Sequence, residues 1–353
     1  MERGGPEFGH HYPLREGGRH VSSHHHLTLL LLPTPSRRFR WAVCQMERLR
    51  RSFPASIRSA LNDLPKSLGE IYEHTLLSID EEKRDYAQRL FQCLTVSFRP
   101  LRAEELADIL AVRFDVKATP RFNADWRLMD AEEADLSACS SLVAVVDVGG
   151  SRVVQISHFS VREFLTSERL ATAENRLSCY HILPGRAHPI LSQAYLSVLL
   201  QLGDKAEKDT TNRFPLPSYA ARHWFDHAQF QSISPHMLDM AMRLFDPVEP
   251  HFAAWVWLYV IDHHWMEPMS GMHPTKPDAV PLYHAVLCGL RDLVEQLLKT
   301  GQYDANSRGG FHATPLHAAA AKGYSEIALL LLTHGADPNS RDHNGWAPLH
   351  RAS

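Results

Sequence analysis

Apolar residues recur every three or four positions from Phe39 onward, which is the spacing of the buried face of a helix. The pattern predicts helices from Asp80 to Phe98, from Ala103 to Arg113 and from Ala131 to Cys139. The stretch before Phe39 has no such period, and its mixture of glycine, histidine and arginine buries too little apolar surface to offset the entropy of ordering. We therefore expect residues 1–38 to form a disordered leader.

The hydrophobic period shortens to two residues after the third predicted helix. Leu142–Val148 and Arg152–Phe159 are rich in valine and flank a glycine pair, which is typical of a β-hairpin. The helical period returns over Val161–Leu170. Three helices followed by a two-stranded hairpin is the order of elements in a winged-helix-like domain, which we predict over residues 81–170.

Short helical segments continue beyond this domain. Residues 178–262 are helical in pattern, and a proline-rich stretch that reads as a linker follows at residues 266–281. We therefore predict a helical connector over residues 171–275. The prolines that separate its segments are Pro184, Pro215, Pro217, Pro235 and Pro247.

The C-terminal part of the chain repeats itself. The tetrapeptide TPLH at residues 314–317 returns as APLH at 347–350, and VPLY precedes it at 280–283. In the first of these, Thr314 can cap a helix whose first turn tolerates the proline. Glycines at matching positions supply the left-handed residue that ends each helix. This pattern resembles ankyrin repeats, with two full units and a truncated third over residues 276–353.

Ankyrin arrays bind protein partners through the tips of their turns and their inner helices, so the resemblance implies a concave contact surface. An alternative stays open for part of it, because Asp342 and Gly345 can simply shape a turn and Trp346 can cover the next repeat. The candidate partner-binding residues are Arg308, Phe311, His312, Arg341, Asp342, His343 and Trp346.

Four upstream segments resemble the fungal NACHT–ankyrin family, whose members are similar to animal NOD-like receptors and belong to the STAND class of signalling NTPases. The segments are FRWAVCQ (39–45), LNDLPKSL (61–68), RPLRAEELADILA (99–111) and SHFSVREFL (157–165). In that family an NTPase module precedes the winged-helix-like domain, the helical stretch and the ankyrin array. The resemblance therefore implies that residues 39–80 are the helical tail of an NTPase module.

The nucleotide-binding core of such a module has no counterpart in the sequence. A phosphate-binding loop needs Gly-x-x-x-x-Gly-Lys-Ser/Thr, and none of the 18 glycines is followed by lysine. The Lys66-Ser67 pair follows a proline in a helical hairpin. We therefore expect no nucleotide cofactor, and we expect the chain to be a truncated gene product or a fragment.

Composition narrows the choice of function. The 37 basic and 40 acidic side chains give a formal charge of −3, so the whole surface does not attract polyanions. Five scattered cysteines without a Cys-x-x-Cys pair favour a reducing, cytoplasmic compartment. The longest apolar run, Phe252–Ile261, is too short to span a bilayer.

Two histidine motifs have simpler structural explanations than metal binding. His223 and His227 have the spacing of metal ligands on one helix face, but no third ligand is placed by spacing. We expect this helix to pack Trp224 and Phe225 instead. The tripeptide at 262–264, Asp-His-His, lacks the further aspartates that a two-metal site needs. We predict no catalytic and no metal-binding residue.

Two features of the winged-helix-like domain suggest ligands that we set aside. The predicted third helix carries Glu132, Glu133 and Asp135, which phosphates repel, so we predict no nucleic-acid partner. We expect His158 and Arg162, after the hairpin, to cap the next helix or to bond to backbone. The family resemblance implies a role for them in sensing a nucleotide.

The sequence thus predicts a mainly α-helical protein that binds a protein partner through ankyrin repeats and catalyses no reaction. Two alternatives remain open. One is an NTPase receptor whose phosphate-loop domain is missing from this chain, and the other is a stand-alone ankyrin adaptor. The sequence does not identify the oligomeric state.

Overall fold

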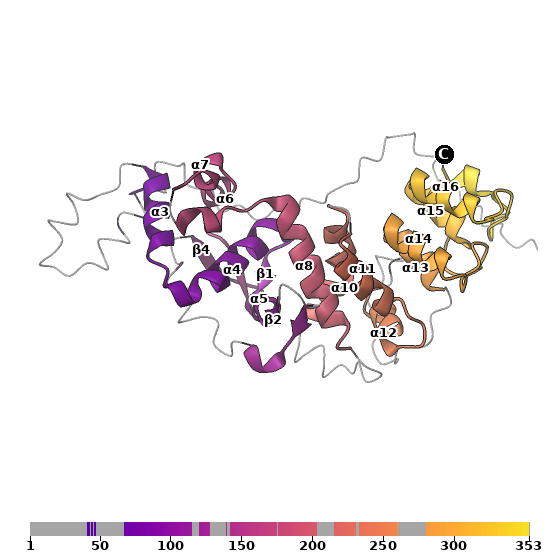
Figure 1. The fold of residues 1–353 in the computed structure, drawn as a ribbon, viewed down its shortest axis with the longest axis horizontal. Coiled ribbons are helices and arrows are strands. Elements are labelled where there is room, and N and C mark those ends of the chain that lie inside the picture. Colours follow the sequence, from indigo (N-terminus) through magenta and orange to yellow (C-terminus); the bar gives the residue numbers. More distant parts are fainter. Residues whose placement is uncertain are drawn as a thin grey trace, which may run out of the picture. The chain divides into compact units, whose positions relative to one another are not determined.

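The computed structural model describes part of the chain, and that part is mostly helical (Figure 1). The predicted leader, most of residues 39–80 and the predicted third helix apart from Cys139 lie outside the described residues. No helix among the described residues is long and apolar enough to cross a membrane. The described residues are 41, 42, 44, 46, 67–114, 120–127, 139, 142–174, 176–202, 215–230, 233–259, 261 and 280–352.

The elements follow one another in three groups. The first group consists of α3 (Leu68–Leu77), α4 (Arg84–Val96), β1 (Leu101–Arg102), α5 (Ala103–Leu110), β2 (Val112–Arg113), β3 (Arg121–Phe122), β4 (Val143–Val148), β5 (Ser151–Ile156), α6 (Phe159–Leu165) and α7 (Glu168–Ala171). The second consists of α8 (Pro184–Leu199), α10 (Leu216–Ala228), α11 (Pro235–Leu244) and α12 (Pro250–Leu258). The third consists of α13 (Pro281–Leu287), α14 (Arg291–Lys299), α15 (Pro315–Lys322), α16 (Ser325–Thr333) and α17 (Pro348–Arg351).

A three-stranded antiparallel sheet in the order β1-β5-β4 forms one side of the first group. β4 and β5 are the predicted hairpin, with Val143 opposite Ile156. The sequence did not predict β1, which places Leu101 opposite Val154. Both of these side chains are fully buried, so β1 ties the hairpin to the helices. A two-residue strand is too short to leave a periodic signal.

Three predicted helices have different bounds in the structure. The predicted Asp80–Phe98 helix begins as α4 only at Arg84, after a 3-10 turn. α5 ends at Leu110 because the next residues form β2, which pairs with β3. The predicted Val161–Leu170 helix is two helices, α6 and α7. Ser167 separates them, since its backbone is extended and its hydroxyl accepts a hydrogen bond from Leu170 N, which caps α7.

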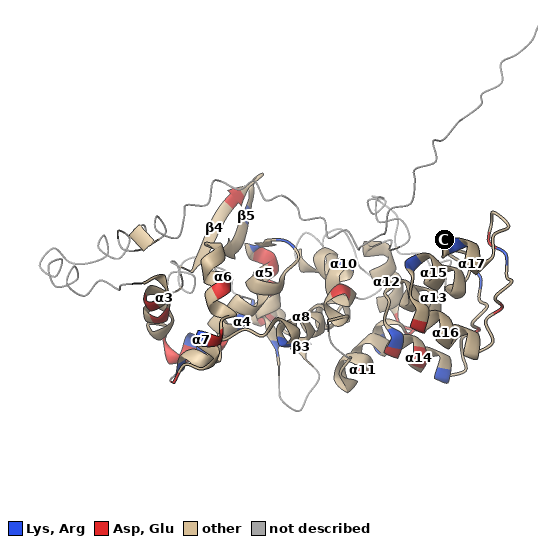
Figure 2. Ribbon diagram, turned by 90° about the horizontal axis from the view of Figure 1, so that it is seen from above, with Lys and Arg blue, Asp and Glu red and all other residues tan. Residues whose placement is uncertain are grey.

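Charged residues of both signs lie along the described elements, and α5 carries acidic ones (Figure 2). Glu105 lies in the first turn of α5, at the positive end of the helix dipole. In the structure the Glu105 side chain is fully buried, and the guanidinium of Arg99 bonds to both of its carboxylate oxygens, at 2.8 and 2.6 Å. Arg102 N donates to Glu105 Oε2 at 2.9 Å. The carboxylate therefore fixes the entry to α5 as well as complementing the dipole.

His158 and Arg162 both bond to backbone, as we expected. His158 Nδ1 accepts a hydrogen bond from Ser160 N at 3.2 Å and so caps α6. Arg162 donates to the carbonyl of Thr95, at the end of α4. The Arg162 bond holds α6 against the end of α4.

The second group is built around paired helices α8 and α10. Ser192 Oγ on α8 donates to the Trp224 carbonyl on α10 at 2.9 Å. Trp224 is fully buried and Phe225 nearly so, which confirms the predicted packing of this aromatic helix. Trp224 also meets the ring of Trp255 on α12, with ring centroids 6.1 Å apart. An aromatic core therefore joins α8, α10 and α12.

The third group has the predicted repeat geometry. Thr314 accepts a hydrogen bond from His317 N, and proline occupies the first position of α15. Gly323 and Gly335 take left-handed backbone angles, with φ of 71° and 86°. Leu349 on α17 is 80% exposed, so this helix leaves apolar surface uncovered.

Candidate partner-binding surface

The loop between α14 and α15 lies beside the loop between α16 and α17 (Figure 1). Asn306 Nδ2 donates to the Gly335 carbonyl at 2.9 Å, and Asp337 N donates to Asn306 Oδ1 at 2.7 Å. Farther along, Arg308 Nη2 donates to the Arg341 carbonyl at 3.1 Å. These bonds cross from one repeat to the next. The two tips therefore form one continuous surface.

Arg308 and Arg341 are exposed and brace the tips. Arg341 Nη1 donates to the Gly345 carbonyl at 3.1 Å, within its own turn, while Arg308 reaches the neighbouring turn. A guanidinium group carries five N–H donors, so these bonds leave donors for a partner. The two side chains can thus both stiffen the surface and contact an acidic or carbonyl-bearing ligand.

Asp342 is a turn residue, which settles one of the alternatives that the sequence left open. Its carboxylate is buried and accepts hydrogen bonds from Asn344 N at 2.8 Å and Trp346 N at 2.9 Å, and Arg351 Nε donates to it at 2.8 Å. Burial acts to raise the pKa of Asp342, but these donors outweigh it and hold the pKa at about 2. The buried carboxylate of Asp342 therefore shapes the tip.

Trp346 is held by its backbone while its ring stays half exposed, at 48%. Its carbonyl accepts a hydrogen bond from His317 Nε2 at 2.9 Å. The Arg351 guanidinium lies 4.9 Å from the ring centroid, in a cation–π contact. An aromatic ring that is fixed before binding loses little entropy on contact with a partner.

Phe311, on the other tip, is likewise 48% exposed on a fixed loop. The neighbouring His312 N donates to the Tyr283 hydroxyl at 3.0 Å. Gly310 has φ of 72°, and a Cβ there would lie 2.3 Å from the Tyr283 ring. The glycine is therefore required for the loop to pack against Tyr283 and present Phe311.

The remaining candidates differ in exposure. His343 is exposed, whereas His312 is half-buried. The sequence missed Arg351, which bonds to Asp342 and lies over Trp346. The repeat offered no signal for it, because the equivalent residue one unit earlier is Ala318.

Helix α10 contacts the first group of elements at its start and the repeats of the third group at its end. At its start, Leu216 N donates to Asp108 Oδ2 at 3.4 Å, and the Tyr219 hydroxyl accepts a hydrogen bond from Phe98 N at 3.2 Å. The Arg99 guanidinium lies 4.3 Å from the Tyr219 ring centroid. Burial raises the pKa of Asp108 to about 6, although a salt bridge to a nearby arginine opposes this.

The other end of α10 meets the repeats. Gln229 Nε2, just past the last turn, donates to the Cys288 carbonyl at 2.7 Å. Gly289 has φ of 69°, and a Cβ there would lie 2.8 Å from the Tyr324 ring and 3.1 Å from Gln229. The end of α10 therefore fits closely against the repeats. The helix, about 20 Å long, therefore contacts both the first group of elements and the repeats.

A buried histidine pair lies in the joint between the first domain and the connector. His188 Nδ1 and His227 Nδ1 are 2.7 Å apart, so one ring donates to the other. Phe98 and Phe230 contact these rings, with Phe230 stacked on His188 at 3.5 Å. Burial lowers the pKa of His188 to about 4 and that of His227 to about 2, and the charges of Arg162 and of His223 act in the same direction.

The histidine pair predicts a loss of stability on acidification. Both rings are neutral in the folded state, while the unfolded chain protonates them below about pH 6.5. The free energy of unfolding therefore decreases as the pH is lowered. The wild-type chain should lose about 2 kcal/mol more than a His227→Asn variant between pH 7 and pH 5. Urea unfolding at both pH values measures this. Equal losses in the two proteins would contradict the prediction, and the comparison cancels the titration of Asp108.

Comparisons with known proteins agree with this architecture. A family model described as ankyrin repeats, in three copies, matches residues 282–353. The C-terminal group is an ankyrin-repeat array. A second family model, described as the winged helix domain of GPI inositol-deacylase, matches residues 73–175. The first group is therefore a winged-helix domain, and the ankyrin match places the tip surface in a module typical of protein interaction.

Three similar proteins come from different kingdoms. Azaphilone pigments biosynthesis cluster protein L of Monascus ruber is 30% identical over 293 residues, which cover 78% of this chain and 61% of that protein. Protein phosphatase 1 regulatory subunit 12A of Mus musculus is 44% identical over 64 residues, covering 18% of this chain and 6% of the relative. A BTB/POZ domain and ankyrin repeat-containing protein, NH5.2 of Oryza sativa, is 44% identical over 73 residues. These residues cover 20% of this chain and 15% of that protein.

Proposed function

We propose that this chain is a non-catalytic, cytoplasmic interaction protein that captures a protein partner on the ankyrin tips. The observation that supports this proposal is a pair of half-exposed aromatic rings, Phe311 and Trp346, on neighbouring tips. Hydrogen bonds between the repeats join these tips. Fixed aromatic side chains beside arginine are the usual anchors of protein interfaces. The flanking Arg308 and Arg341 would supply the polar rim.

The proposal extends to a place in the fungal NOD-like receptors. The order of winged-helix domain, helical connector and ankyrin repeats is that of the NACHT–ankyrin family, and the relative that shares most of this chain is also fungal. In this role α10 would transmit partner binding from the repeats to the winged-helix domain. Its bonds to Phe98 at one end and to Cys288 at the other support such a relay.

Replacement of both Phe311 and Trp346 by alanine should abolish most partner capture. Loss of two aromatic anchors typically costs at least 2 kcal/mol, or about thirtyfold in affinity. Affinity capture with the full chain, quantified by mass spectrometry against the double variant, measures this. The Val248→Ala variant is the control, because Val248 is 88% exposed and lies outside the ankyrin repeats. Equal capture by all three proteins would contradict the tip surface.

The competing function is that of an NTPase receptor. Isothermal titration of the chain with ATP and GTP distinguishes the two, because the proposal expects no heat of binding at micromolar nucleotide. Saturable micromolar binding would favour the receptor. A partner captured without nucleotide binding would favour the interaction protein or the stand-alone ankyrin adaptor.

A further inference from the structure

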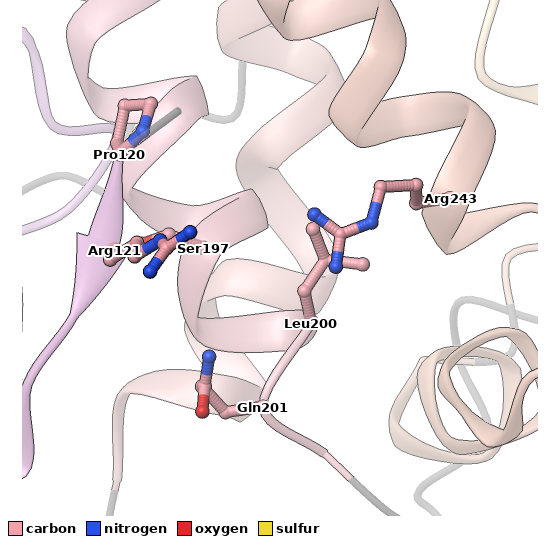
Figure 3. Close-up of a pocket in the computed structure, with 6 residues that line it drawn as sticks. All are labelled: Pro120, Arg121, Ser197, Leu200, Gln201 and Arg243. Atoms are coloured by element: carbon pink, nitrogen blue, oxygen red, sulfur yellow. The ribbon is translucent and has the colours of Figure 1, made fainter. Parts of the chain in front are cut away.

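A cavity of about 320 Å³ opens where the winged-helix domain meets the connector (Figure 3). Arg121 on β3 and Arg243 on α11 extend toward each other from opposite sides of it. The last turn of α8 and the residues just after it form the base, with Ser197 in the helix and Gln201 beyond its end. The volume lies at the lower end of the range for small-molecule sites.

The pairing of β2 with β3 adds a third positive charge beside Arg121. Arg113 lies directly opposite Arg121 in this antiparallel pair, so both side chains leave the same face of the ribbon. Like charges in this position destabilise a strand pair. The Arg113 guanidinium also lies 5.4 Å from the Trp126 ring centroid, which keeps it next to the strand pair.

Arg121 and Arg243 face a cavity whose described lining holds no acidic side chain. Among the residues that the structure describes, neither Arg121 nor Arg243 forms an ion pair, although Asp239 lies one turn before Arg243 on α11. Ser197 Oγ already donates to the Ala194 carbonyl, so its hydroxyl can only accept a further hydrogen bond. The converging arginines are therefore the groups that remain to bind a ligand.

We propose that this cavity binds a small molecule that carries two or more phosphate groups. Two guanidinium forks on opposite walls match two separate oxyanions, and a phosphate offers each fork several acceptor oxygens and a high charge density. The ligand would offset the positive charges of Arg121 and Arg243. It would also connect β3 to α8 and α11 and so stabilise the joint between the two domains. This inference is independent of the proposed partner surface.

Isothermal titration of the full chain with inorganic pyrophosphate at constant ionic strength tests the site. Arg121→Gln and Arg243→Gln should each weaken binding at least tenfold, and Arg121→Lys should lie between Arg121→Gln and the wild type because it keeps the charge but loses the fork. Arg186→Gln is the matched control, since Arg186 is an exposed arginine on the first turn of α8, at the other end of the helix. Circular dichroism of each variant verifies folding.

Each outcome decides the proposal. No binding by the wild-type chain, or equal weakening by the Arg186→Gln control, would overturn it. Citrate binding as tightly as pyrophosphate would overturn the assignment to phosphate. A lower melting temperature of the variants, with no heat of pyrophosphate binding, would also overturn the proposal and would show that the arginines only offset the negative end of the α8 dipole.

Discussion

Replacement of Glu105 by alanine is expected to lower the free energy of unfolding by about 3 kcal/mol. The Glu105 carboxylate is fully buried and accepts hydrogen bonds from both terminal nitrogens of the Arg99 guanidinium. Its removal leaves Arg99, two-thirds buried, without its counter-charge, and it also frees the Arg102 N–H at the start of α5. Urea unfolding followed by circular dichroism at pH 7 measures the loss.

The neighbouring glutamate provides the control for this variant. Glu104 lies on the same first turn of α5 but is exposed, so Glu104→Ala should cost less than 1 kcal/mol. Burial acts to raise the pKa of Glu105, but Arg99 and Arg102 hold it below its usual range. The wild-type chain should therefore lose its advantage over Glu105→Ala as the pH falls below the usual glutamate pKa.

A double-mutant cycle separates the ion pair from the rest of the effect. Arg99→Met in the Glu105→Ala background should recover part of the lost stability, because it removes the uncompensated charge. Full additivity of the two substitutions would show that the pair contributes nothing. A Glu105→Ala protein as stable as Glu104→Ala would contradict the importance of its burial.

Local sequence patterns predicted the elements whose causes are local. The ankyrin unit repeats its cap, its proline and its glycines, and the glycine pair fixes the hairpin, so the period and turn chemistry determine both. Thr314 caps α15 and Gly323 ends it at the positions that the repeat predicts. The same repeated residues predict that Phe311 and Trp346 lie in the turns between the helices.

Long-range contacts account for what the sequence did not reveal. β1 exists because Leu101 meets Val154, which lies 53 positions away, and nothing near either residue marks that pairing. Asp342 resembles a contact residue in the sequence, yet Arg351 and the turn's own N–H groups bury its charge. Such contacts depend on the packed fold, which single-residue patterns do not encode.

Replacement of Trp255 by alanine is expected to cost about 4 kcal/mol, the largest single effect on the connector. The ring is fully buried against Trp224 and Phe245, and Nε1 donates to the Ala221 carbonyl of α10 at 2.9 Å. It also meets the His284 ring of the first ankyrin helix, with centroids 6.0 Å apart. The variant leaves a large cavity and removes the hydrogen bond between α12 and α10 at the centre of the proposed relay.

Two readouts distinguish lost packing from lost coupling. Trp255→Phe keeps most of the ring but loses the hydrogen bond, so it should lower the free energy of unfolding far less than Trp255→Ala does. Val248→Ala, at an exposed position, should not change the free energy of unfolding measurably. Hydrogen exchange of α13 and α14 should rise in Trp255→Ala, because these helices pack on the connector. If exchange rises only in α10 and α12, the aromatic core stabilises the connector alone, and the relay must depend on the contact between Gln229 and Cys288.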